Sequence, residues 1–197
     1  MSDPDTIRLY DRQADRYADL TDGHNAADPL LAAFIAACPK GARVLDLGCG
    51  PGASAAAMAR AGLRVDAIDA SAEMVARAGA HEGVTAWRAT FDELGQEAIH
   101  DGVWANFSLL HAPRSEMPRH LAAIHRALRP GGVFHLAVKL GQGESRDRLG
   151  RFYAYYSEAE LDRLLAEAGF AVLGKRFGSG TGLDGSVSDW IAVTARA

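Results

Sequence analysis

A glycine-rich stretch at residues 44–52, VLDLGCGPG, constrains the fold of this chain more than any other segment. Its first four residues are apolar except for Asp46, as in a buried strand, and glycines follow at positions 48, 50 and 52. Glycines with this spacing let the backbone turn sharply out of a strand and let a ligand approach closely, because no Cβ stands in the way. An alanine-rich segment begins at about residue 53. The stretch therefore predicts a strand, a ligand-binding loop and a helix in succession.

Predicted strands alternate with predicted helices along the rest of the chain. Apolar runs predict strands at residues 42–47, 63–69, 84–88, 102–107, 133–139, 170–177 and 187–195. Helices are expected at residues 5–20, 28–38, 54–61, 71–79, 116–128 and 157–169, and loops at 141–152 and 178–185. Alternation requires right-handed crossovers, which build a doubly wound α/β fold with a mostly parallel seven-stranded sheet and helices on both faces. Because no helix separates the last two strands, the last strand is expected to be antiparallel.

Three of the predicted helices have recognisable amino-terminal signals. Asp28 stands before Pro29, which combines a side chain suited to capping with a residue suited to the first helical position. Ser71 is expected to cap the helix that follows the second strand. Ser157 is followed three residues later by Glu160, the spacing of a capping box.

Length, charge and cysteine content narrow the functional classes. The 197 residues fit one domain, and a formal net charge of −4 with no run of Lys or Arg gives no electrostatic case for a nucleic-acid partner. Two cysteines 11 residues apart, without a CxxC or a His/Cys cluster, predict neither disulfides nor a metal site. The amino terminus is polar and acidic, and no apolar run approaches the roughly 20 residues that span a bilayer. We expect a cytoplasmic protein that binds no membrane.

Polar residues at the ends of the predicted strands indicate the type of ligand. Asp69 ends the second strand, 19 residues beyond Gly50, where its carboxylate can accept hydrogen bonds from both hydroxyls of a ribose. A dinucleotide and an adenosyl ligand would use such a residue equally. Asp46, however, would repel a pyrophosphate bound at the glycine loop, whereas a carboxylate there suits an ammonium group. This favours a ligand with a methionine-like tail over a diphosphate.

Three segments together resemble the class I S-adenosylmethionine-dependent methyltransferases: VLDLGCGPG, VDAIDAS with Asp69, and LRPGGVF before the fifth strand. The match extends in order and spacing over residues 7–195. The resemblance implies S-adenosylmethionine as the cofactor and a seventh strand inserted between the fifth and the sixth. It also implies one domain over residues 1–197, in which residues 1–38 form cover helices. The segment from Val138 to Leu161 is similar to small-molecule methyltransferases of bacteria.

The resemblance assigns cofactor contacts by position. It places the methionine tail at the glycine loop, the ribose at Asp69, the adenine between Ala70 and Met74, and a tyrosine of the cover helix over the site. Many relatives have an acidic residue after the third strand, where this chain has Thr90, so Asp92 or the backbone at Phe91 would take that contact. The full set is Tyr17, Asp46, Gly48, Cys49, Gly50, Asp69, Ala70, Met74, Thr90, Phe91, Asp92, Asn106 and Phe107.

The acceptor side is less defined by the sequence. His111 follows the fourth strand and is a candidate base or positioning group, although a histidine there could equally hydrogen-bond the loop backbone. Lys139 and Arg146 could bind an anionic substrate or remain solvated, and Tyr153 and Tyr156 could line the pocket or pack in the core. Five other histidines are expected on helix surfaces or at strand turns, without a function: His81, His100, His120, His125 and His135.

Two alternatives to methyl transfer to a small molecule remain open. A nicotinamide-dependent oxidoreductase is disfavoured by Asp46, by the glycine spacing and by the lack of a Tyr-x-x-x-Lys pair. A non-catalytic module that retains the cofactor site is the other alternative. Asn106 is followed by Phe-Ser-Leu rather than Pro-Pro-Tyr, and no inserted domain is evident, so a small acceptor is expected. The accepting atom and the oligomeric state are left open by the sequence.

Overall fold

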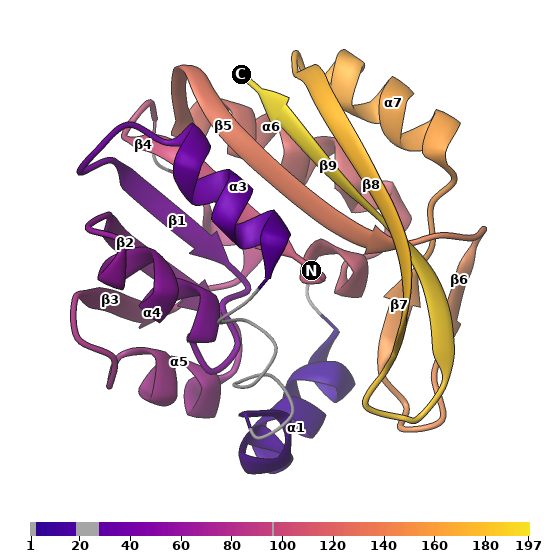
Figure 1. Ribbon diagram of the computed structural model, residues 1–197. Helices are drawn as coiled ribbons and strands as arrows, with labels where there is room; N and C mark the ends of the chain where they lie inside the picture. The colour runs from indigo at the N-terminus through magenta and orange to yellow at the C-terminus, as the bar shows by residue number, and fades with distance from the viewer. Residues whose placement is uncertain (1–2, 19–27, 96) are drawn as a thin grey trace.

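The computed structural model describes residues 3–18, 28–95 and 97–197, and its centre is a seven-stranded sheet in the order β3-β2-β1-β4-β5-β9-β8 (Figure 1). The strands β1 to β5 pair in parallel, and β9 is antiparallel to both β5 and β8. The predicted α/β class, the inserted antiparallel strand and its place are therefore confirmed. The strands are β1 Arg43–Leu47, β2 Arg64–Asp69, β3 Val84–Arg88, β4 His100–Asn106, β5 Leu128–Lys139, β8 Ala171–Thr181 and β9 Val187–Arg196.

Helices cover both faces of the sheet, because successive residues of the buried strands point to opposite sides. Val44 packs with the side of the core that includes Phe34 and Met58, whereas Leu45 packs with the side that includes Ile124 and Leu161. The helices α3 and α4 thus lie on one face and α6 and α7 on the other. The helix bounds are α1 Pro4–Arg12, α3 Pro29–Ala37, α4 Ala53–Arg60, α5 Ala72–Ala78, α6 Met117–Ala127 and α7 Glu158–Glu167.

The capping signals behave largely as the sequence predicts. The Asp28 carboxylate accepts a hydrogen bond from the Leu30 amide at 2.8 Å, and the Ser71 hydroxyl accepts one from the Met74 amide at 3.2 Å. Ser157 accepts from the Glu160 amide at 3.3 Å. Only this half of the predicted capping box forms, because the Glu160 carboxylate is engaged by Arg114 instead. The predicted first helix ends at Arg12, a second helical stretch covers residues 14–18, and the rest of the prediction falls outside the described residues.

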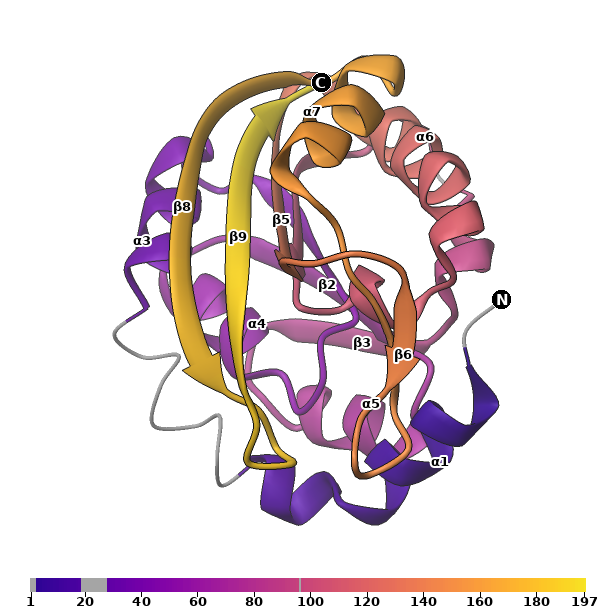
Figure 2. The same ribbon diagram turned by 90° about the vertical axis from the view of Figure 1, so that its right-hand side faces the viewer.

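Two segments differ from the predicted loops. The predicted loop at 141–152 contains β6 (Glu144–Arg146), which pairs antiparallel with β7 (Phe152–Ala154), so the prediction was wrong there. The strand β8 continues to Thr181, where a loop was expected from residue 178. Glycine makes this extension possible, since a Cβ at Gly178 would lie 2.3 Å from the Trp190 ring of β9. Figure 2 shows the long β8–β9 pair along one side of the molecule.

Three histidines expected at the surface are buried. His100 begins β4 with an exposed fraction of 0%, His135 stacks on Trp104 at 3.7 Å within the sheet, and His120 of α6 is 3% exposed. Their neighbours provide polar partners or aromatic faces, which an apolar–polar pattern does not reveal. Within the described part of the chain, no helix combines the length and apolar character that a bilayer crossing requires.

Candidate functional site

A pocket lies at the carboxyl ends of β1, β2 and β4, the edge at which ligands bind in open parallel sheets. The space between its walls, including its open mouth, is about 660 Å³. Most of the predicted site residues form its wall. These are Tyr17, Gly48, Gly50, Asp69, Ala70, Met74, Thr90, Phe91, Asn106, Phe107 and His111.

The glycine loop forms the floor in a conformation that favours glycine. Gly48 and Gly50 have φ values of 75° and 53°, in the left-handed region. The amides of Gly48 and Cys49 both donate to the Ile68 carbonyl, at 2.8 and 2.9 Å, which ties the loop to the end of β2. A Cβ at Gly48 would lie 2.3 Å from the Cβ of Ser108, so the close approach of these two segments also requires glycine.

Asp69 links this loop to the helix that follows β2. Its carboxylate accepts a hydrogen bond from the Gly50 amide at 3.0 Å and another from the Ser71 amide at 2.9 Å. Burial raises the pKa of Asp69, although these amides oppose the shift. Each carboxylate oxygen can accept a second hydrogen bond, so Asp69 retains acceptor capacity toward the pocket.

Asp46 lies directly behind the loop and is 3% exposed. Its Oδ2 atom is buried without a hydrogen-bond partner in the described structure. Burial, together with the nearby Asp69, raises the pKa of Asp46 to about 8. Neither carboxylate forms an ion pair with a basic residue of segments 3–18, 28–95 or 97–197. Two uncompensated acidic groups beside one pocket make a site that fits a cationic ligand.

Cys49 stands between these glycines but does not form part of the pocket wall. It is 8% exposed, and burial raises the pKa of its thiol. A thiol that stays protonated is a poor nucleophile. The residue is therefore suited to packing beneath the loop.

At the adenine side, the polar groups of the segment after β3 are used locally. The amide and hydroxyl of Thr90 donate to the Glu93 carboxylate at 2.7 and 2.9 Å, which begins the short helix η1 (Phe91–Glu93). Asp92 lies outside the wall, and Arg119 of α6 donates to its carboxylate. Phe91 is thus the side chain of η1 that faces the pocket.

On the acceptor side, His111 is held through both ring nitrogens. Its Nδ1 lies 2.7 Å from the Phe152 carbonyl and its Nε2 lies 3.0 Å from the Tyr10 hydroxyl. A carbonyl only accepts, so Nδ1 carries the hydrogen and Nε2 accepts from Tyr10. Burial lowers the pKa of His111 to about 4. The imidazole is therefore neutral, and the lone pair on its Nε2 atom accepts the hydrogen bond from Tyr10.

Tyr10 and Arg151 are site residues that the sequence analysis did not assign. Tyr10 forms part of the wall, and its ring meets the Tyr17 ring edge to face at 5.3 Å. Arg151 is 2% exposed, pairs with Asp147 at 2.7 Å and donates to the Tyr10 hydroxyl at 3.1 Å. The seven-residue spacing of Tyr10 and Tyr17 places both on one helical face, which was the available signal for Tyr10. No local pattern marks Arg151.

The four tentative substrate residues lie behind or beside the wall rather than in it. The Lys139 ammonium sits 4.0 Å from the centre of the Tyr153 ring, which in turn packs 4.7 Å from His111. Arg146 donates to the Asp3 carboxylate at 2.9 and 2.7 Å. Tyr156 is fully buried, with the Arg114 guanidinium 4.9 Å from its ring centre.

The helix α1 covers the pocket and is tied to the β6–β7 hairpin. Besides the Asp3–Arg146 pair, the Thr6 hydroxyl accepts a hydrogen bond from the Phe152 amide at 2.9 Å. Asp11 accepts from the Ser71 hydroxyl at the start of α5. In Figures 1 and 2, α1 and the hairpin lie at the same end of the sheet. Asp3 and Thr6 line the pocket, although the sequence did not indicate it.

Comparisons with known proteins agree with this geometry. A family model described as a methyltransferase domain matches residues 44–132. The chain is 33% identical over 149 residues to trans-aconitate 2-methyltransferase of Deinococcus radiodurans, a match over 75% of this chain and 57% of that protein. It is 34% identical over 110 residues to an S-adenosyl-L-methionine-dependent Diels-Alderase of Talaromyces variabilis, a match over 51% of this chain and 37% of that protein.

A solved structure resembles nearly the whole chain. The 1,6-didemethyltoxoflavin-N1-methyltransferase of Burkholderia thailandensis, with S-adenosylhomocysteine bound, superposes with a TM-score of 0.78 and 28% identity over 96% of this chain and 87% of that one. The chain spans only 57% of the length of the Deinococcus relative. The fold, the glycine loop and these similarities together show that the chain belongs to the class I S-adenosylmethionine-dependent methyltransferases.

Proposed function

We propose that this chain transfers a methyl group from S-adenosylmethionine to a small-molecule acceptor. The observation that carries the proposal is a pair of buried carboxylates, Asp69 in the pocket wall and Asp46 behind the glycine loop, neither of which is paired with a basic side chain of the described residues. S-adenosylmethionine has an ammonium, a sulfonium and two ribose hydroxyls, which together match such a site. The Burkholderia relative adds support, because it binds S-adenosylhomocysteine and its fold matches 96% of this chain.

The residues of the wall suggest how the cofactor is held. Asp69 would accept hydrogen bonds from the ribose hydroxyls, and Gly48 and Gly50 would admit the methionine tail to the field of Asp46. The adenine would lie near Ala70, Met74, Thr90 and Phe91, with Phe91 contributing a ring face. Asp92 is engaged by Arg119, which leaves the backbone at Phe91 as the better partner for the adenine amine. Asn106, Phe107 and Tyr17 would complete the wall around the tail and the sulfonium, and Cys49 would support the loop from beneath.

The chain's own residues would then position the acceptor and exclude water. When bound, S-adenosylmethionine supplies a methyl carbon that the sulfonium already activates, so alignment of the acceptor is the main requirement. Alignment of this kind is worth roughly 7–11 kcal/mol in favourable systems. Tyr10 is placed to hold the acceptor, and His111, neutral and bonded through Nε2, would orient Tyr10 rather than act directly as a base. Lys139, Arg146, Tyr153 and Tyr156 would support this arrangement from behind the wall.

We further propose that residues 1–197 act as one domain with residues 1–38 as its cover, a role consistent with α1 over the pocket. A small acceptor fits the covered pocket better than a nucleic acid or a membrane surface. Both cysteines, Cys38 and Cys49, are free thiols, which suits a reducing cytoplasm.

Calorimetric titration and a transfer assay test the proposal together. The protein should bind S-adenosylhomocysteine and not NADH. With methyl-labelled cofactor and a panel of small acceptors that present oxygen, nitrogen or sulfur atoms, label should appear on one chemical class. Binding of NADH alone would point to an oxidoreductase and contradict the proposal.

A second function is supported by the Talaromyces relative, whose name couples the same cofactor to a Diels-Alder reaction. In that case, the pocket would hold the cofactor without transferring its methyl group. Tight binding of S-adenosylmethionine, with no release of S-adenosylhomocysteine for any acceptor in the panel, would favour this function over methyl transfer.

A further inference from the structure

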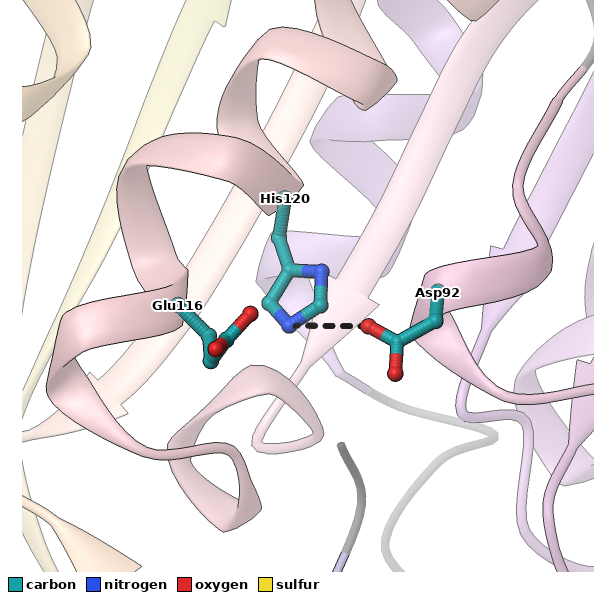
Figure 3. Close-up of side chains that lie close together, drawn as sticks. All are labelled: Asp92, Glu116 and His120. Atoms are coloured by element: carbon teal, nitrogen blue, oxygen red, sulfur yellow. Dashed lines mark ion pairs between the residues drawn. The ribbon is translucent and has the colours of Figure 1, made fainter.

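Three potential metal-binding side chains meet outside the cofactor pocket (Figure 3). Asp92 belongs to η1, Glu116 ends the short helix η3 (Arg114–Glu116), and His120 lies one turn into α6. One donor atom from each lies within 4.8 Å of the other two. The group therefore joins the segment after β3 to the start of α6.

The histidine is the informative member of this cluster. His120 is 3% exposed, and its Nε2 atom is buried without a hydrogen-bond partner in the described structure. Figure 3 shows the ring edge turned toward Asp92, whose Oδ1 lies 3.9 Å from Nε2. A buried polar atom left unpaired is costly, and an ion is one of the few features that account for it. The ring is also held edge to face against Phe91 at 5.6 Å.

The exposed Arg119 pairs with both carboxylates. Its guanidinium donates to Asp92 and to Glu116, while the side chain itself is 54% exposed. It does not satisfy the His120 nitrogen. Exposed ion pairs of this kind contribute little stability. Arg119 can therefore move into solvent, after which both carboxylates can turn their oxygens toward an ion beside the imidazole.

We propose that Asp92, Glu116 and His120 bind one divalent transition-metal ion, and that Arg119 takes its place when the ion is absent. One imidazole nitrogen with two carboxylate oxygens is a donor set suited to Zn²⁺ and similar ions, and unsuited to Mg²⁺, which prefers oxygen alone. Two such donors on one tetrahedral Zn²⁺ lie roughly 3.4 Å apart, so the pair at 3.9 Å would have to close by about half an ångström. The carboxylate of Asp92 is exposed and that of Glu116 is half-buried, so both would be able to move toward the ion.

This site is distinct from the cofactor pocket but adjoins it. Phe91 lines that pocket and contacts the His120 ring, and Asp92 follows it in the chain. A bound ion would thus fix η1 against α6. No sequence pattern indicates this metal site, because Asp92 is remote in sequence and Glu116 and His120 form only a single i, i+4 pair. The proposal is independent of methyl transfer and is tested without it.

The test uses the full chain, free of any affinity tag, with Zn²⁺ in calorimetric titration and Co²⁺ in visible absorption. We expect one ion per chain, a cobalt spectrum typical of mixed nitrogen and oxygen ligands, and no competition by Mg²⁺. His120→Asn should weaken binding by more than about 100-fold, since it removes a ligand rather than a neighbouring residue. His125→Asn, on the same helix but outside the cluster, is the matched control and should bind like the wild type.

Arg119→Gln separates a metal site from a solvated ion network. If Arg119 competes with the ion, its removal should tighten Zn²⁺ binding about tenfold, because two weak ion pairs no longer have to break. Three results would overturn the proposal: no stoichiometric binding in the wild type and Arg119→Gln alike, equal loss in His120→Asn and His125→Asn, or weaker binding after Arg119→Gln.

Discussion

Single carboxyl groups determine what this pocket is able to hold. Asp46 and Asp69 are both shielded from water, and Asp69 raises the cost of ionising Asp46. A protein that keeps two such groups together without a basic side chain gains stability from a ligand that brings positive charge and hydroxyl donors. The glycine loop provides access, whereas these carboxyl groups provide the preference for one ligand chemistry.

Asp69→Ala should weaken the binding of S-adenosylhomocysteine. The change removes charge-assisted hydrogen bonds to the ribose, each worth about 1.5–3 kcal/mol, so the dissociation constant should rise at least about tenfold. Calorimetric titration measures the effect. Glu73→Ala, in the first turn of the next helix, is the control and should bind as the wild type does. Equal affinities for wild type and Asp69→Ala would show that the ribose is held elsewhere.

The affinity for S-adenosylhomocysteine should depend on pH through Asp46. Its pKa is raised to about 8, so below that value an incoming ammonium must expel a proton, and affinity should rise with pH by up to about tenfold per unit until about 8. Without ligand, the same group reduces stability as the pH rises from the ordinary pKa of 3.8 to about 8, because the unfolded chain loses its proton first.

Titrations between pH 6 and 9, in buffers of different ionisation enthalpy, measure both the affinity and the proton released. Asp46→Asn has no proton to lose and should show weaker binding with a flat profile. The assignment fails if the variant keeps the slope of the wild type.

At the scale of secondary structure, the cover of the pocket depends on contacts between distant segments. The helix α1 is amphipathic, yet its polar residues rather than its apolar ones reach the hairpin. Asp3 pairs with Arg146, Thr6 accepts from the Phe152 amide, and Tyr10 meets His111 and Arg151. These ties make the hairpin and α1 one cover, so cofactor exchange requires that some of them break.

Weakening this cover should speed the release of cofactor. Thr6→Val keeps the size of the buried side chain but removes the acceptor for the Phe152 amide. Loss of about 1 kcal/mol of hydrogen bonding should raise the dissociation rate of S-adenosylhomocysteine about fivefold. Stopped-flow displacement with a fluorescent cofactor analogue measures the rate. Asp5→Ala, which breaks an exposed pair with Arg8 on the same helix, should leave it unchanged, and a similar acceleration in both variants would argue against the tie.

For the whole molecule, the sequence was sufficient for the sheet and insufficient for its cover. Alternating elements and signals such as Pro29 and Ser71, which act within a few residues, predict the strands and helices, and the family resemblance implies the place of the last strand. The hairpin β6–β7 was missed because glycine and charge in residues 141–152 obscure its short strands, whose partners lie across the hairpin.

The same distinction applies to the site. Asp46 and Asp69 could be found because a local motif and a strand end define them. Tyr10 and Arg151 are separated by 141 positions, and the partner of His111 lies 101 positions away. These groups come together only when the chain folds, and a local sequence pattern does not show which distant residues will meet. The strands and the residues at their ends are therefore predictable from the sequence here, whereas the side-chain contacts of the cover are not.

Stability and ligand binding should be separable, because a second polar cluster lies at the opposite end of the sheet. Asp66 accepts hydrogen bonds from His100 at 2.8 Å and from Arg43 at 2.7 Å, joining β1, β2 and β4. Burial opposes ionisation, but these partners outweigh it and hold the pKa of Asp66 below its usual value. Its contribution to stability is therefore complete above the unfolded pKa and is lost as the pH falls through the lower folded value.

Asp66→Ala should leave the buried His100 without its acceptor and destabilise the fold by about 1–3 kcal/mol, which lowers the melting temperature by about 2–12 °C. Glu167→Gln, which breaks an exposed pair with Arg163, should change it by less than about 1 kcal/mol. Calorimetry at neutral pH measures both. The difference between wild type and Asp66→Ala should begin to shrink below the ordinary Asp pKa of about 3.9 and should be lost as the pH falls through the lower folded pKa of Asp66. Affinity for S-adenosylhomocysteine at a temperature well below both transitions should stay equal to that of the wild type. A fall in affinity that matches the fall in stability would mean that the amino end of the sheet is coupled to the pocket, and that the two ends do not act independently.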